Sequence, residues 1–359
     1  MANLVKLGLG HACDELNLSP HFRGHICTVI GRARLIMGIL FCRHGIRLLK
    51  VAVLALVVWG GHRTIAEGFT QLRQNSWEIN QLRPGRAVIA GALYLISQFP
   101  SGWFWHGVLN ALGQFVGLLK TMRGYYIGHL GKYVPGKALV ILLRAYLVGG
   151  PSCNMSLAVV AVFYETFTTM AVGAVLAAAI LLAMHRDQTY LILGALGLAA
   201  VVGVPTLPAV FVRLMRWINL PESTVASPSA LRLSWWLWAR GWFTIAVGWV
   251  LAGASLWATV QAIGVDGTNL FADLPIYTAT VALSVAAGFV SMLPAGLGVR
   301  EIVLLQLLAP QLDQLMPAQG ERMALIAVIV LRLTWLAAEI VLAAILYPLR
   351  NRSLATSGE

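Results

Sequence analysis

The sequence predicts an all-α, polytopic membrane protein with about six spanning helices and two re-entrant helical hairpins that break at proline and glycine. Of its 359 residues, 58% are hydrophobic and only 11% are charged, which is too apolar for an ordinary soluble domain of this length. Several apolar runs reach the roughly 20 helical residues that a hydrocarbon core requires. Two further apolar runs are interrupted near their middles, which makes eight apolar segments in all.

The uninterrupted runs predict the spanning helices at roughly residues 45–62, 86–112, 154–184, 188–212, 235–264 and 323–349. They define one integral membrane domain, residues 45–350, between a polar tail at 1–44 and a short tail at 351–359. The N-terminal tail mixes cysteine and histidine without the paired spacing that marks a zinc site, so we expect no metal or other cofactor.

The formal net charge of +12 is better explained by membrane topology than by nucleic-acid binding. Basic residues gather in the N-terminal tail, after the second predicted span and at the C-terminus, and none of these groups forms an aromatic-interleaved binding patch. The positive-inside rule therefore predicts a multi-pass protein with both termini in the cytoplasm.

The two interrupted runs predict helix-turn-helix hairpins. The first, residues 115–147, breaks at Pro135 and Gly136. The second covers residues 274–308, and its break contains Pro294, Gly296 and Gly298. Proline removes a backbone donor and glycine relaxes the chain, and such broken backbone is tolerated at membrane depth only inside protein or beside a polar cavity. If each hairpin enters and leaves the membrane on one side, the span count places the ends of the first in the cytoplasm and those of the second outside. The two hairpins would then be inverted relatives, a pattern that points to a transporter's binding site.

Charged side chains flank both breaks and suit a phosphate. Lys132, Lys137 and Arg144 accompany the first break, and Arg300 and Glu301 follow the second. Arginine offers a planar fork, lysine a point charge, and a helix N-terminus a positive dipole end. The structural alternatives are that the lysines reach out to lipid headgroups and that Arg300 and Glu301 form local ion pairs with other helices.

Glu165, Arg332 and Glu339 also lie inside predicted spans. Glu165 sits mid-span, where a charge is costly, so we expect it to pair with Arg144 or Arg300, to carry a proton, or to fix helix packing as a hydrogen-bonded carboxyl. Arg332 and Glu339 are seven residues apart and share one helical face, which favours structural partners within the membrane.

No soluble-type catalytic motif accompanies these residues. The sequence has no phosphate-binding GxxxxGK[ST] loop, no HExxH and no GxSxG, so we expect the chain not to be an enzyme.

The segments GHLGKYVPGKALVILLRAYLV and GFVSMLPAGLGVREIVLLQLL, together with Glu165, resemble the lysylphosphatidylglycerol synthase transmembrane-region family of flippase-like proteins. The resemblance covers roughly residues 45–350 and implies a polytopic inner-membrane protein that moves lipids between leaflets. Full-length synthases carry an aminoacyl-transferase domain after the membrane region, and this chain stops about ten residues beyond its last predicted span. We therefore expect it not to make lysyl-phosphatidylglycerol by itself.

Three functional hypotheses follow. In the first, a flippase-like transporter holds the phosphate of an anionic membrane lipid with Lys137, Arg144 and Arg300, while Glu165 and Glu301 balance that charge. In the second, a membrane-embedded transferase uses a polyprenyl-phosphate donor, with Glu165 or an outer-loop carboxylate such as Glu67 or Glu78 as general base. In the third, the chain is an accessory subunit that docks a lipid-modifying enzyme.

Overall fold

The computed structural model describes residues 59, 62, 63, 65–74, 77, 79–133, 138–150, 153–184, 189–217, 233–291 and 298–348. All of them belong to one compact unit, Trp59–Glu359. Each named element within these ranges is a helix. The elements are η1 (Ile79–Gln81), α4 (Pro84–Ala111), α5 (Leu118–His129), η2 (Leu130–Tyr133), α6 (Ala138–Val148), α7 (Met155–Met184), α8 (Thr189–Gly203), η3 (Val204–Thr206), α9 (Pro208–Trp217), α10 (Trp235–Ala262), α11 (Leu270–Val290), α12 (Val299–Leu315) and α13 (Gly320–Leu346).

Local sequence signals explain where the long helices begin. Pro84 occupies the first turn of α4, where a missing N–H costs nothing. The Ser234 hydroxyl caps α10 by accepting from the Leu237 N–H, and the Asn269 side chain caps α11 in the same manner. These caps satisfy backbone donors that would otherwise have no partner.

Six helical segments of the described chain are long and apolar enough to cross a membrane. Five match predicted spans, namely α4, α7, α8 with η3, α10 and α13. Most of the other predicted span, residues 45–58, lies outside the described residues. The sixth candidate is α11, which has 21 residues and includes the first arm of the predicted hairpin at 274–308. That assignment underestimated the segment, which is a helix of full spanning length.

The first predicted hairpin consists of two short helices. The helices α5 and α6 have 12 and 11 residues, too few for either to cross a hydrocarbon core, and they pack against each other. Pro135, Gly136 and Lys137 at the break lie outside the described residues. Re-entry of this pair into the membrane stays a prediction.

The second break separates α11 from α12. Pro294 and Gly296 lie outside the described residues, whereas Gly298 is described and caps the start of α12 with a φ of +84°. Glycine fits that left-handed position because it has no Cβ. The proposed inverted relation between the two breaks also stays a prediction.

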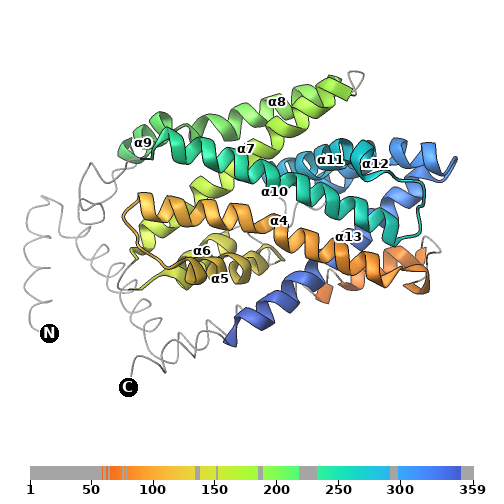
Figure 1. The fold of residues 1–359 in the computed structure, drawn as a ribbon, viewed down its shortest axis with the longest axis horizontal. Coiled ribbons are helices and arrows are strands. Elements are labelled where there is room, and N and C mark those ends of the chain that lie inside the picture. Colours follow the sequence, from red (N-terminus) through yellow and green to blue (C-terminus); the bar gives the residue numbers. More distant parts are fainter. Residues whose placement is uncertain are drawn as a thin grey trace, which may run out of the picture. The chain divides into compact units, whose positions relative to one another are not determined.

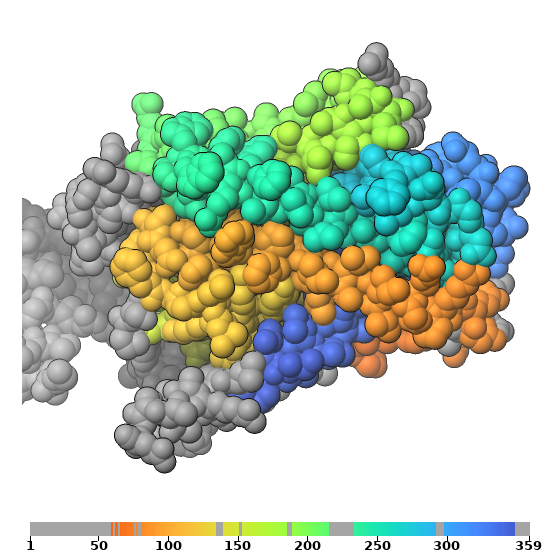
Figure 2. Space-filling model, in the orientation of Figure 1, coloured from red at the N-terminus to blue at the C-terminus, as the bar shows by residue number. Residues whose placement is uncertain are grey.

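The centre of the bundle forms where α10 packs against α4 and α11. Figure 1 shows α4 and α10 running alongside each other, and their side chains abut on the face drawn in Figure 2. A Cβ at Gly248 would lie 2.7 Å from the Ser97 carbonyl oxygen, so glycine permits this approach. The Ser255 hydroxyl donates to the Ala90 carbonyl at 2.7 Å and accepts from the Trp335 indole at 3.0 Å. One buried hydroxyl thus joins α10, α4 and α13.

Candidate functional site

The most deeply buried ion pair joins α6 to α7. Arg144 Nη1 lies 2.8 Å from Glu165 Oε2, and their side chains are 4% and 2% exposed. The carboxylate also accepts from the hydroxyls of Thr166, at 3.2 Å, and Thr169, at 3.0 Å. The guanidinium lies over the Tyr125 ring, 3.9 Å from its centroid. A buried carboxylate with this many donors is well compensated, because each hydrogen bond replaces lost hydration.

A second ion pair joins η2, which follows α5, to α13. Lys132 Nζ lies 2.5 Å from Glu339 Oε1 and 3.0 Å from the Tyr94 hydroxyl. That hydroxyl also donates to Glu339, and the Tyr94 ring stacks on Trp335 with centroids 4.2 Å apart. Lys132 therefore extends inward to a carboxylate, and the alternative in which it reaches out to headgroups is wrong.

A third ion pair joins α12, just after the second break, to α13. Arg332 Nη1 lies 2.6 Å from Glu301 Oε1, while Glu301 Oε2 accepts from the Gly298 N–H at 2.6 Å. The expected local ion pair of Glu301 with another helix is thus confirmed. The N-terminus of α12, which we had expected to offer its dipole to a ligand phosphate, already holds the Glu301 carboxylate.

Arg300 differs from these paired residues. Its Nε and Nη2 atoms are buried and have no hydrogen-bond partner within the described part of the chain. Its guanidinium lies 4.9 Å from the centroid of the Trp335 ring and close enough to Arg332 and Glu301 to interact with their charges. A buried guanidinium that lacks acceptors leaves a charge only partly compensated, which is costly in a low-dielectric interior.

His129 links the first two ion pairs. Its Nδ1 lies 2.8 Å from Arg144 Nη2, and its Nε2 lies 3.8 Å from Glu339 Oε1. A guanidinium can only donate, so Nδ1 acts as the acceptor and the imidazole is neutral in this arrangement. The histidine therefore contacts both charged groups without adding a charge.

We call this connected set the charged interior. It contains four cationic side chains and three carboxylates: Lys132, Arg144, Arg300, Arg332, Glu165, Glu301 and Glu339. These residues lie far apart along the chain, with Lys132 and Glu339 separated by 207 residues. With His129 neutral, one positive charge is left over among these residues.

The structure brings together most of the residues that the sequence had singled out. Of the two partners expected for Glu165, Arg144 is the one it contacts, and Arg300 is not. Lys137, also predicted to bind the phosphate, lies outside the described residues. Arg240 lies over Trp103, 4.5 Å from the ring centroid, and is not part of the charged interior.

Sequence reasoning missed Tyr94, His129 and Trp335. Tyr94 and Trp335 lie in apolar helices, where an aromatic side chain gives no sign of a polar contact. The one available signal was His129, which stands two residues before the Gly131 of the first break segment. Across the described ranges, no cluster of three or more histidine, cysteine, aspartate or glutamate side chains could hold a metal ion.

Comparison with known proteins identifies the family. The family model described as "Lysylphosphatidylglycerol synthase TM region" matches residues 47–318 of the 359. No curated protein matches the chain. Because the family model covers most of the sequence, the chain belongs to this family and is a multi-pass membrane protein.

Proposed function

We propose that this member of the lysylphosphatidylglycerol synthase transmembrane-region family is a flippase-like transporter. Its cargo is an anionic phospholipid or a polyisoprenoid lipid that carries a phosphate, and it moves this lipid between leaflets. The observation that carries the proposal is Arg300, whose buried Nε and Nη2 have no hydrogen-bond partner among the described residues. A phosphate offers the paired oxygens that such a guanidinium fork binds.

The charge of the interior supports an anionic ligand. Each of its three carboxylates has a cationic partner within 2.8 Å, so Arg300 supplies the remaining positive charge. A phosphodiester headgroup carries one negative charge and would neutralise it. Because an ionised group inside a membrane is costly without a counter-charge, a bound headgroup would stabilise this site.

The surroundings of Glu165 support transport over a transferase reaction. A general base needs a free carboxylate within hydrogen-bond reach of its substrate. Both oxygens of Glu165 already accept hydrogen bonds from neighbouring side chains, including Arg144 at 2.8 Å and Thr169 at 3.0 Å. The carboxylate is therefore better suited to holding Arg144 in place than to abstracting a proton.

The test is headgroup-labelled lipid movement in proteoliposomes, with phosphatidylglycerol and a short polyprenyl phosphate as substrates. We expect the wild type to move at least one of them, Arg300→Gln to abolish movement, and Arg300→Lys to retain part of it. Arg240→Gln is the control, because that arginine lies against Trp103 and outside the charged interior. Unchanged movement in folded Arg300→Gln would overturn the proposal.

Two further parts of the proposal concern location and Lys137. We infer an inner-membrane location from the family, cytoplasmic termini from the distribution of basic residues, and a role for Lys137 in holding the same phosphate. Cysteine accessibility at each terminus in intact cells tests the topology. If a lipid-modifying enzyme co-purified and Arg300→Gln had no effect on lipid movement, the accessory-subunit hypothesis would replace transport.

A further inference from the structure

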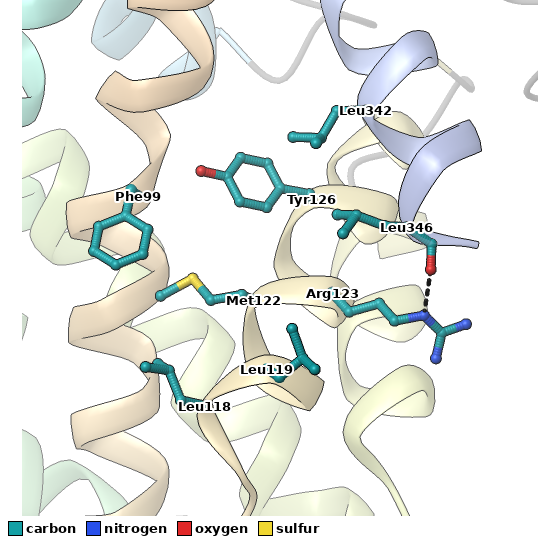
Figure 3. A pocket seen from close by; sticks show the side chains of 8 residues that line it. All are labelled: Phe99, Leu118, Leu119, Met122, Arg123, Tyr126, Leu342 and Leu346. Carbon is teal, nitrogen blue, oxygen red and sulfur yellow. Dashed lines mark hydrogen bonds between the residues drawn. The ribbon is translucent and has the colours of Figure 1, made fainter. Parts of the chain in front are cut away.

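A groove of about 330 Å³ lies between α4, α5 and α13, and no member of the charged interior lines it. Figure 3 shows Phe99 of α4 facing Met122 of α5, with Leu342 and Leu346 of α13 along the other wall. Leu118 and Leu119 continue the lining at one end. On α5, Tyr125 contacts Arg144 and Glu165, whereas the next residue, Tyr126, faces the groove. The groove is thus a separate feature from the Arg300 site.

The groove is apolar and open at the surface of the protein. Its walls α4 and α13 are candidate spanning helices, while α5 between them is too short to cross. The outer rim is exposed at Phe99 and Leu119, whose exposed fractions are 46% and 68%. The Tyr126 hydroxyl, the polar group of an otherwise apolar side chain, donates to the Leu95 carbonyl at 2.9 Å. The lining therefore presents hydrocarbon to whatever fills it.

A positive charge is fixed at the α13 end of the groove. Arg123 Nε donates to the Leu346 carbonyl at 2.9 Å, and Nη2 donates to the Tyr347 carbonyl at 3.1 Å. Figure 3 shows this guanidinium held beside Leu346 at the rim. The combination of an apolar groove and a cation at its end complements a molecule that has an apolar chain and an anionic group.

We propose that this groove binds one acyl chain of an anionic phospholipid, with the lipid phosphate beside Arg123. The volume supports a slender occupant: a helix with its side chains is about 10–12 Å across, so 330 Å³ holds less than one helical turn. Apolar contact with the groove and attraction to Arg123 act together, because the hydrocarbon and the phosphate belong to one molecule. This site does not depend on lipid transport.

The test uses photo-crosslinking in phosphatidylcholine nanodiscs that contain a phosphatidylglycerol probe with a diazirine in one acyl chain. After illumination, digestion and mass spectrometry map the labelled residues. We expect labelling concentrated on α5 and the last turns of α13, several-fold above that on the exposed face of α8. Leu119→Trp should lower the groove labelling several-fold, because the indole fills the open rim.

A matched control is Leu193→Trp on α8, where the leucine is similarly exposed, at 63%, and lies outside the groove. It should leave the groove labelling unchanged. Labelling spread evenly over α5 and α8, or unaffected by Leu119→Trp, would overturn the acyl-chain site.

The role of Arg123 is tested by comparing that probe with a neutral diacylglycerol that carries the same diazirine chain. The wild type should label several-fold more with the anionic probe, and Arg123→Gln should remove this preference. Because the ratio is measured within each variant, loss of the contacts to α13 does not by itself change it. Equal labelling by the two probes in the wild type would overturn the phosphate contact.

Discussion

Arg144 and Arg300 occupy comparable places but have different partners. Each lies on the helix that follows a Pro/Gly break, and each guanidinium lies against an aromatic ring, 3.9 Å from the Tyr125 centroid and 4.9 Å from the Trp335 centroid respectively. Arg144 donates to Glu165 and lies against His129. Arg300 has both Nε and Nη2 buried without a partner in the described residues, whereas Arg144 has only Nε in that state.

From this difference we infer a structural role for Arg144, and it fits the ligand-binding role proposed for Arg300. A buried arginine that is matched to a carboxylate contributes to holding the fold, and removing it leaves that carboxylate uncompensated. A buried arginine with unused donors leaves no carboxylate behind when it is removed, and its donors are available to a ligand. Stability and lipid movement should therefore respond in opposite ways at the two positions.

The largest effect on stability is expected for Arg144→Gln. Loss of the guanidinium leaves the buried Glu165 without its counter-charge, and removing one partner of a buried pair costs about 3–5 kcal/mol of unfolding free energy. Unfolding in mixed detergent micelles measures this. The double variant Arg144→Leu with Glu165→Leu should recover much of the loss, since no charge is left unpaired. Near-wild-type stability of Arg144→Gln would contradict the structural role.

A smaller loss is expected for Lys132→Met. Glu339 loses its ammonium partner but keeps the Tyr94 hydroxyl as a donor, so we expect a loss of about 2 kcal/mol. The same unfolding measurement applies, with Lys120→Met as the control, because Lys120 donates to the Gly149 carbonyl at 3.2 Å and forms no ion pair within the described residues. Equal effects of the two lysine substitutions would show that the pair with Glu339 has no special importance.

Arg300→Gln should change the unfolding free energy by less than about 1 kcal/mol while abolishing lipid movement. Its glutamine leaves the ion pair between Glu301 and Arg332 intact. Measuring stability and transport on one preparation sharpens the comparison with Arg144. If Arg300→Gln unfolded as readily as Arg144→Gln, both arginines would be structural.

The smallest effect is expected for Asp266→Asn in the loop before α11. Arg83 Nη1 lies 2.6 Å from Asp266 Oδ1, and hydrogen bonding to Arg83 lowers the pKa of this exposed carboxyl. A lowered pKa stabilises the folded state above the unfolded value of about 4, and that contribution disappears as the pH falls through the folded value. The melting temperatures of wild type and variant should thus differ slightly at pH 7 and converge below about pH 4. A difference that grew toward acid pH would contradict the assignment.

The sequence predicted the spans better than the interior contacts. Apolar runs and caps such as Ser234 marked the long helices, because hydrophobic length is a local property. It also showed that Glu165, Arg332 and Glu339 needed partners, since charges inside apolar runs are costly.

The identity of those partners depended on tertiary packing. Lys132 meets Glu339 and Arg332 meets Glu301 only because η2, α12 and α13 come together. The length of α11 was missed because one apolar run through residues 274–308 was interpreted as a single broken unit. Proline and glycine in that run mark an interruption but give no measure of the helix before it.

The unmatched charge of Arg300 has an electrical consequence. With the proposed phosphodiester bound, the seven side chains of the charged interior and the ligand would together be neutral, and their rearrangement would be insensitive to the membrane potential. Once the lipid left, these seven side chains would carry one elementary charge, and moving that charge across the membrane would change the energy by about 2.3 kcal/mol per 100 mV. The voltage across the membrane would then act on the return of the empty transporter, and lipid movement measured at different potentials in proteoliposomes would report on that step.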